Sequence, residues 1–193
     1  MKKIVILWLV LFSLSGCGTF SAPLDVLSQG FAPLEKMFNP KTNSRYYERK
    51  ARHLVNQLVD RMEDENSNDA IRKIAIMDLV DHNGRVAELG RYLSLKITNE
   101  ISKNNYFKLA PRGDLLDAMK SLNMDFDSFK TSIPKEFGEV LQVEAVISGK
   151  IIDLGTNLDV NVNSIDVKTG EIIASASESF ARSDFATEML RKY

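Results

Sequence analysis

Residues 145–180 read AVISGKIIDLGTNLDVNVNSIDVKTGEIIASASESF. The stretch holds three runs of β-branched or alternating residues, at Ala145–Leu154, Asn157–Val167 and Glu171–Phe180. Short turns separate the runs, and Lys168-Thr169-Gly170 supplies a glycine that can adopt the positive φ of a hairpin turn. Strands joined by such short loops pair antiparallel. The stretch therefore predicts a three-stranded antiparallel meander.

The middle run of this stretch changes phase. Apolar residues occupy even positions as far as Val162, but odd positions at Ile165 and Val167. A shift of one residue turns a side chain to the opposite face of a sheet. We therefore predict a β-bulge at Asn163-Ser164, which would keep the apolar residues of both halves on one face.

Upstream of the meander, short apolar runs alternate with helical patterns. Arg72–Asp78 and Tyr106–Ala110 have the length and composition of buried strands. Five segments predict helices because their apolar residues recur every three or four positions, and Asp114 is the expected N-cap of the third. These segments are Ser44–Glu63, Glu88–Lys103, Asp114–Leu122, Pro134–Leu141 and Asp184–Lys192.

The element order is a helix, then β-α-β-α-α, then β-β-β. Strands connected through helices pair in parallel with right-handed crossovers, whereas the last three strands form the meander. The predicted fold class is α/β. Its sheet is mixed and five-stranded, with a parallel β-α-β part and a C-terminal antiparallel meander, and helices flank it.

The N-terminus reads MKKIVILWLVLFSLSGCG. After two lysines, Ile4–Leu14 has the length of a signal-peptide core and is well short of the ~20 residues that span a bilayer. Small residues then precede Cys17, the one cysteine of the chain. This combination resembles a bacterial lipobox, and it predicts a signal peptide over residues 1–16 and lipidation at Cys17. The alternative is an ordinary secretory signal that ends beside a cysteine.

Cleavage before Cys17 would leave 177 of the 193 residues, enough for one domain with a tail. We predict a tether over residues 17–43 and a single domain over residues 44–193. Loss of Lys2 and Lys3 would lower the formal charge from −1 to −3. A chain with this slightly negative net charge lacks the excess of Lys and Arg that binding to nucleic acid requires. An acylated Cys17 cannot form a disulfide, and two histidines leave little material for a metal site.

Three segments carry a family resemblance. They are KIAIMDLVDHNGRVAELGRYLSLKITNEI at residues 73–101, FKLAPRG at 107–113 and VLQVEAVISGKIIDLGTNLDVNVNSIDVKTGEIIASA at 140–176. Together they resemble the FlgO domain, within the broader group that includes the TolB amino-terminal domain, LpoB and the curli pore CsgG. The last segment is the most specific. One departure is Gln142-Val143-Glu144-Ala145, where the family more often has a Gly-Val-Asp-Ala type of sequence.

The resemblance implies an outer-membrane lipoprotein that faces the periplasm, with a helix-wrapped mixed sheet and no catalytic centre. In such lipoproteins an aspartate after the cysteine tends to retain the product at the inner membrane, and Gly18 stands at that position. FlgO proteins are associated with the flagellum and motility. CsgG relatives form pores from extended hairpins, but this chain has no inserted pair of ~10-residue alternating segments, so a pore is not expected.

The sequence offers no catalytic constellation. Asp78, Asp81 and His82 follow the first strand, where α/β folds often bind ligands, but a carboxylate there more often caps the next helix or loop. Nucleophile motifs, phosphate loops and metal-ligand spacings are missing from the sequence, so we expect no enzyme, no cofactor and no metal. We expect Arg112 to be an ion-pair partner rather than an anion clamp. Cys17 is the one residue to which we assign a function.

Three functions compete. The first is an accessory or structural role in flagellum assembly or motility through protein contacts. The second is an LpoB-like regulation of peptidoglycan synthesis, or another role in envelope or secretion assembly. The tether of ~27 residues reaches at most ~95 Å, which is short for an activator that crosses the periplasm. The third is a hydrolase or small-ligand receptor. It is disfavoured because the sequence contains no catalytic or ligand-binding motif.

The first predicted helix, Ser44–Glu63, is the expected contact surface. It lies outside the segments that carry the resemblance, and it is joined directly to the tether. Tyr46-Tyr47 with Arg45, Arg49 and Arg52 forms either a contact patch or an ordinary solvated helix face with buried stems. The sequence does not choose between these two interpretations.

Overall fold

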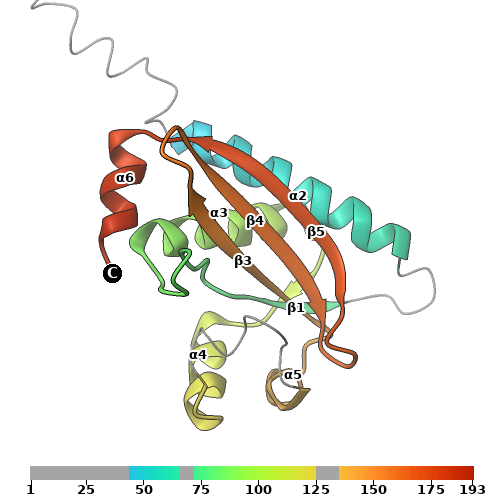
Figure 1. Ribbon diagram of the computed structural model, residues 1–193. Coiled ribbons are helices and arrows are strands. Elements are labelled where there is room, and N and C mark those ends of the chain that lie inside the picture. The colour runs from blue at the N-terminus through green and yellow to red at the C-terminus, as the bar shows by residue number, and fades with distance from the viewer. Residues whose placement is uncertain (1–43, 66–71, 125–134) are drawn as a thin grey trace, which may run out of the picture. The chain divides into compact units, whose positions relative to one another are not determined.

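The structure is a computed structural model that describes residues 44–65, 72–124 and 135–193. All of these residues lie in one compact unit, Met37–Tyr193. Figure 1 shows the five helices and five strands of the described ranges. In chain order they are α2 (Ser44–Glu65), β1 (Lys73–Ile76), α3 (Glu88–Asn104), β2 (Lys108–Leu109), α4 (Arg112–Ser121), α5 (Lys135–Leu141), β3 (Ala145–Asp153), β4 (Asn157–Asp166), β5 (Ile172–Ala181) and α6 (Asp184–Arg191).

The five strands form one mixed sheet in the order β2-β1-β3-β4-β5. β1 is parallel to both of its neighbours, and Ile74 pairs with Leu109 of β2 and with Ala145 of β3. β3, β4 and β5 pair antiparallel in chain order. The α/β fold class, the parallel part and the antiparallel meander are therefore confirmed.

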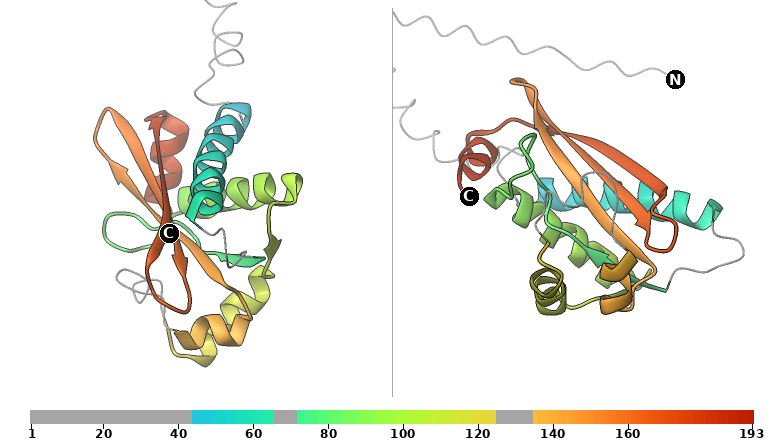
Figure 2. Two further views of the ribbon diagram at one scale, coloured as in Figure 1. Left: turned by 90° about the vertical axis from the view of Figure 1, so that its right-hand side faces the viewer. Right: turned by 60° about the horizontal axis from the view of Figure 1, so that its bottom comes forward.

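α2 and α3 cover one face of this sheet (Figure 2). Leu58 of α2 and Ile97 of α3 are buried in one cluster with Ile147 of β3 and Val160 of β4. The apolar stripe at three- and four-residue spacing is the buried side of α2. Each large aliphatic side chain buried in this way contributes about 1.5–3 kcal/mol relative to exposure. α2 is therefore an integral layer of the fold.

α4 and α5 cover the opposite face of the sheet over part of its area. Phe137 of α5 is fully buried and clusters with Val146 of β3 and Ile165 of β4. The backbone of Gly138 lies so close to Val167 that a Cβ atom at Gly138 would collide with the valine side chain. The remaining part of this face, on β3, β4 and β5, is not covered by any of the described helices (Figure 1).

This two-sided core explains the phase change in β4. Val162 faces the layer of α2 and α3, whereas Ile165 faces the layer of α4 and α5. The prediction that both halves share one apolar face was therefore wrong. An irregularity does occur at the predicted place, but it lies in the pairing with β5. The register shifts between Ser164 and Ile165, and the extra residue is Ile173 of β5.

The ends of the elements lie close to the predicted ones, with one exception in α4. This helix begins at Arg112, with Pro111 at the N-cap position, so the prediction of Asp114 as N-cap was wrong. Asp114 instead lies in the first turn, where its negative charge suits the positive end of the helix dipole. The predicted hairpin glycine, Gly170, has a φ of 75°. The predicted helix start at Pro134 lies outside the described residues.

Candidate functional site

Asp78 follows β1, Arg112 opens α4, and their side chains form a bidentate ion pair. Nη1 of Arg112 donates to Oδ1 of Asp78 at 2.6 Å, and Nη2 donates to Oδ2. The side chain of Asp78 is 3% exposed, whereas that of Arg112 is 53% exposed. The hydrogen bond to Asp78 raises the pKa of Arg112 above its ordinary value. Both carboxylate oxygens of Asp78 are thus engaged, and Arg112 is the ion-pair partner that the sequence predicted.

Asp81 is buried in the loop after β1, and protein groups bind both of its oxygens. Oδ1 accepts hydrogen bonds from the backbone N–H groups of Asn83 and Arg85 at 2.7 and 2.9 Å. Oδ2 accepts from the hydroxyl of Tyr193 at 2.9 Å and lies 3.4 Å from Nη2 of Arg85. Burial alone would raise the pKa of Asp81, but these hydrogen bonds and the charge of Arg85 outweigh it, and the pKa is lowered. Asp81 therefore stabilises a loop.

The structure does not bring Asp78, Asp81 and His82 together as one binding site. The two carboxylates bind different partners, and His82 is exposed. Among the residues that the structure describes, no group of three His, Cys, Asp or Glu could hold a metal ion. In the same part of the chain, no helix is long and apolar enough to cross a membrane. Cys17 lies outside the described residues.

The two tyrosines of α2 point into the fold. Tyr47 is 1% exposed, and its ring centroid lies 6.1 Å from that of Phe180 and 5.5 Å from that of Phe185. Burial raises the pKa of Tyr47. The hydroxyl of Tyr46 accepts a hydrogen bond from the backbone N–H of Ala181 at 2.7 Å. The tyrosines are therefore packing residues, and the contact-patch interpretation was wrong for them.

The arginines of α2, in contrast, lie on its outer side. Arg45, Arg49 and Arg52 are all exposed. Nε of Arg52 donates to Oε2 of Glu100 on α3 at 3.0 Å, and the side chain of Glu100 is 8% exposed. This hydrogen bond raises the pKa of Arg52. Arg52 therefore ties α2 to α3, and a substitution of Arg52 would weaken the packing of these two helices.

A second ion pair joins the same two helices. Nζ of Lys96 on α3 donates to Oε1 of Glu48 on α2 at 2.9 Å and to Oγ of Ser44 at 3.0 Å. The hydrogen bonds from Lys96 and Ser44 lower the pKa of Glu48. Lys103 follows Lys96 on α3 after seven residues, which is two helical turns, so both lysines lie on the side of α3 nearest α2. This spacing is visible in the sequence, but the packing of α3 beside α2 is not.

α2 also covers the outer edge of β5. Nη1 of Arg61 donates to the backbone oxygen of Ser175. Nε2 of Gln57 donates to the backbone oxygen of Ser177 at 3.5 Å. Together with the hydrogen bond that Tyr46 accepts, these contacts fix α2 along the edge strand.

The uncovered face of β3, β4 and β5 carries mostly short polar side chains. The pairing register places three rows of three residues on it. The rows are Ser148, Asn163 and Ser175, then Lys150, Asn161 and Ser177, then Ile152, Asp159 and Ser179. Asn and Asp are depleted in strands, so strand propensity does not explain this composition. The face offers hydrogen-bonding groups without a cluster of like charges.

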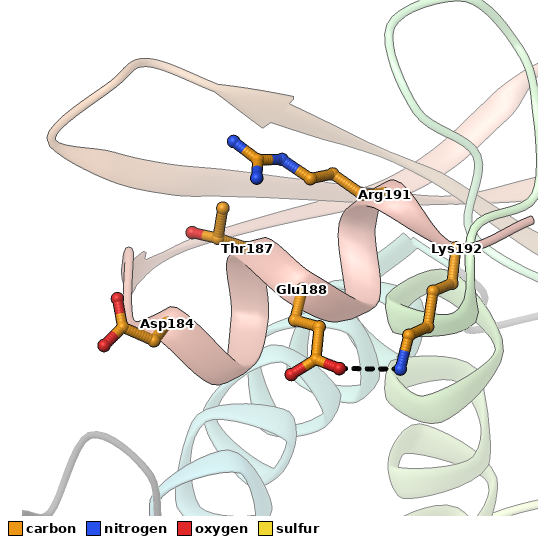
Figure 3. A pocket seen from close by; sticks show the side chains of 5 residues that line it. All are labelled: Asp184, Thr187, Glu188, Arg191 and Lys192. Carbon is orange, nitrogen blue, oxygen red and sulfur yellow. Dashed lines mark hydrogen bonds and ion pairs between the residues drawn. The ribbon is translucent and has the colours of Figure 1, made fainter.

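A shallow hollow of about 390 Å³ lies on the outer side of α6 (Figure 3). Its lining residues come from α6 and the residue that follows it. They are Asp184, Thr187, Glu188, Arg191 and Lys192. Nζ of Lys192 donates to Oε1 of Glu188 at 2.7 Å, and both side chains are exposed. The hollow is therefore the open surface of one short helix, and it contains none of the predicted site residues.

The described domain is thus a helix-covered mixed sheet whose candidate sites are surfaces. Residues 52–185, more than half of the chain, match the FlgO protein family. The chain therefore belongs to the FlgO protein family, as the resemblance in its sequence predicted. A comparison with curated protein sequences found no match.

Solved structures of LpoB have a similar fold. The C-terminal domain of LpoB from Salmonella enterica is 17% identical with a TM-score of 0.52, and the similarity covers 67% of this chain and 96% of that chain. The NMR structure of E. coli LpoB is 14% identical with a TM-score of 0.52, over 69% of this chain and 68% of that chain. At these identities the similarity establishes a shared fold.

Proposed function

We propose that the chain is an outer-membrane lipoprotein, anchored through Cys17 and facing the periplasm, with an accessory or structural role in flagellum assembly or motility. It acts through protein contacts and catalyses no reaction. The family match over residues 52–185 carries this proposal. The lipobox-like sequence around Cys17 supports the anchor, and Gly18 supports the outer membrane as the destination.

In this proposal the chain has three parts. Residues 1–16 are a signal peptide that is removed, residues 17–43 are the lipidated N-terminus and tether, and residues 44–193 are the single FlgO-like domain. α2, from Ser44 onward, packs into the core of the fold and is therefore assigned to the domain. The hydrogen-bonded carboxylates of Asp78 and Asp81 support a non-enzymatic role, because neither is free to act as an acid or a base.

The anchor is tested first. Wild-type protein should fractionate with the outer membrane, and mass spectrometry of its mature N-terminus should show acylated Cys17. Cys17→Ser should give an unprocessed or soluble form, because the thiolate is the group that lipidation requires. An unmodified N-terminus on membrane-associated wild-type protein would refute the anchor.

The role is tested by deleting the gene in a flagellated host and scoring swimming, flagellar attachment and β-lactam sensitivity. Loss of motility with unchanged β-lactam sensitivity is the expected result. Wild-type protein should restore swimming, whereas Cys17→Ser at equal abundance should not. Normal swimming in the deletion strain would remove the flagellar role.

The alternative is an LpoB-like regulator of peptidoglycan synthesis or another envelope or secretion assembly factor. The fold shared with LpoB favours this second function. The short tether disfavours it, because ~27 extended residues reach at most ~95 Å. Raised β-lactam sensitivity with normal swimming in the deletion strain would select this alternative.

A further inference from the structure

Asparagine and aspartate alternate along the uncovered side of β4. These residues are Asn157, Asp159, Asn161 and Asn163. Valine and threonine are the residues that strands favour, whereas asparagine and aspartate are depleted there. Natural chains break such local rules mainly at functional sites. We therefore treat the three uncovered rows on β3, β4 and β5, together with Asn157, as a candidate binding surface and call it the polar sheet face (Figure 1).

Hydrogen bonds within the polar sheet face hold the side chains at its two ends. At one end, Oγ of Ser175 donates to Oδ1 of Asn163 at 2.9 Å. At the other end, Nδ2 of Asn157 donates to Oδ1 of Asp159 at 2.8 Å and to Oγ of Ser179. These side chains are therefore ordered before a ligand arrives, and such ordering lowers the entropy cost of binding.

The middle row of the polar sheet face consists of Lys150, Asn161 and Ser177, and it is different. Within the part of the chain that the structure describes, no protein group hydrogen-bonds to these three side chains. An ammonium group donates hydrogen bonds, whereas an amide and a hydroxyl both donate and accept them. Three available hydrogen-bonding groups thus lie in a line across the sheet, between side chains that are already held in place.

The composition of the polar sheet face suits a neutral ligand that is rich in hydroxyl groups. Its one cation, Lys150, and its one carboxylate, Asp159, balance each other, so it has no excess charge for phosphate or nucleic acid. Ile152 is its one large apolar residue, and the rows contain none of the aromatic side chains that anchor protein interfaces. Sugars fit this composition, because their hydroxyl and acetamido groups pair with ammonium, amide and hydroxyl groups.

The spacing of the middle row suits a sugar polymer. Neighbouring strands lie ~4.8 Å apart, which is close to the length of one sugar ring in an extended β-1,4-linked chain. A chain that crosses the strands would therefore place successive sugars over Lys150, Asn161 and Ser177. The amide of Asn161 can donate to an acetamido group and accept from it at the same time. This match favours an N-acetylated polymer.

We propose that the polar sheet face binds the N-acetylated glycan strands of the cell wall. The inference rests on the proposed function, because a domain that faces the periplasm meets this polymer there. Hydrogen bonds to single sugars contribute little net free energy in water, so each contact is weak. The tether from Cys17 would hold the domain near the polymer and raise the effective concentration of the face.

The test uses residues 17–193 with Cys17→Ser, so that no acyl chain contributes to binding. The protein is sedimented with purified cell-wall sacculi, with and without soluble oligosaccharides of β-1,4-linked N-acetylglucosamine. The sacculi should carry the protein down, and the oligosaccharides should release it. In a nuclear magnetic resonance titration of the same protein with these oligosaccharides, the amide signals of Lys150, Asn161 and Ser177 should shift most.

The variant Asn161→Val with Ser177→Val removes one amide and one hydroxyl from the middle row. Valine is favoured in strands, so this variant should melt no lower than the parent, while its affinity for sacculi should fall at least about tenfold. The matched control is Asn99→Ala with Ser102→Ala, which removes the same two groups from exposed positions on α3, on the other side of the sheet. The affinity of this control should stay within about twofold of the parent, as expected for surface changes away from the site.

Equal affinity of the valine variant and the parent, or an equal loss in the control, would overturn the proposal. Amide shifts confined to other surfaces of the domain would overturn it without any substitution. Equal release by oligosaccharides of β-1,4-linked glucose, which have no acetamido group, would exclude selection of an N-acetylated glycan. Sedimentation that no oligosaccharide reverses would overturn the proposal in favour of the peptide part of the cell wall.

This experiment separates the inference from the proposed function. Because the assay uses unacylated protein, its failure leaves the Cys17 anchor and the motility test intact. Failure of the anchor in membrane fractionation likewise leaves the sacculus result intact.

Discussion

The hydroxyl of Tyr193 donates a hydrogen bond to Oδ2 of Asp81 at 2.9 Å, joining residues that are 112 positions apart in the sequence. Arg85 completes the group, because its Nη2 donates to the Tyr193 hydroxyl at 2.9 Å and its guanidinium lies 4.1 Å from the centroid of the Tyr193 ring. The N–H of Glu88 donates to the backbone oxygen of Lys192 at 2.8 Å. The residues after α6 therefore hold both the loop after β1 and the first turn of α3.

Asp81→Asn should flatten the dependence of stability on acid pH. The pKa of Asp81 is lower in the folded chain than in the unfolded chain. Its contribution to stability is therefore complete above the unfolded value of about 4, and it is lost as the pH falls through the folded value. Thermal unfolding midpoints measured from about pH 7 to about pH 3 should fall less steeply for the variant than for wild type.

The control for this prediction is Asp117→Asn, since the side chain of Asp117 is 80% exposed on α4. This control should keep the wild-type slope of midpoint against pH. If the midpoint of Asp81→Asn fell with pH as steeply as that of wild type, the hydrogen bonds to Asp81 would not favour its charged form.

Arg112→Ala should lower the free energy of unfolding by about 2 kcal/mol, because it leaves the buried carboxylate of Asp78 without its cation. The double variant Asp78→Asn with Arg112→Ala should lose less than the two single losses together, as expected for groups in direct contact. Denaturant unfolding measures all three changes. Lys120→Ala, at an exposed position on the same helix, should change stability by less than about 0.5 kcal/mol. Additive losses in the double variant would contradict the coupling.

Two buried serines should respond to alanine substitution in opposite directions. Oγ of Ser164 has no hydrogen-bond partner, so Ser164→Ala should raise the free energy of unfolding by about 1 kcal/mol. Oγ of Ser94 accepts a hydrogen bond from the N–H of Leu79 at 3.0 Å and donates to the backbone oxygen of Gly90 at 2.8 Å. Ser94→Ala should therefore lower the free energy of unfolding by about 1–2 kcal/mol. The same sign for both variants in denaturant unfolding would refute the prediction.

Two helical glycines form a second matched pair. A Cβ atom on Gly90 of α3 would collide with the backbone oxygen of Leu79, so Gly90→Ala should destabilise the fold by about 1–3 kcal/mol. A Cβ atom on Gly113 of α4 meets no atom within 4 Å, so Gly113→Ala should stabilise the fold by about 0.5 kcal/mol through the better helix propensity of alanine. Thermal melts of the two variants give the comparison. A neutral Gly90→Ala would mean that α3 can move away from Leu79 without loss.

Local spacing was enough to predict the strands and helices, because periodicity records which side of an element is buried. It was not enough for β4. Val162 and Ile165 lie on opposite faces of the sheet, and Phe137 of α5 covers the face that carries Ile165. A β-bulge that kept both residues on one face would produce the same change of phase in the sequence, so the sequence alone does not distinguish the two arrangements. The α4 start was mispredicted for a similar reason, since Arg112 is held by Asp78 and its position depends on a partner outside the helix.

The candidate surfaces were harder to predict than the fold. Tyr46 and Tyr47 stand among arginines in the sequence, and their partners Phe180 and Phe185 come from the far end of the chain. Only tertiary packing turns these tyrosines inward and leaves the arginines outside. The bond between Tyr193 and Asp81 likewise has no local signal in the sequence.

The position of α2 along β5 also bears on how copies of this domain behave when they are crowded. An open strand edge is a template on which another extended chain can build, and this is the first step towards swapped dimers and fibrils. The backbone oxygens of Ser175 and Ser177 already accept hydrogen bonds from α2, and the strand at the other edge of the sheet, β2, is two residues long. Neither edge of the described sheet therefore presents a long row of unpaired backbone N–H and C=O groups to another strand. Copies of this domain can therefore be held at high concentration without their sheets joining at either edge.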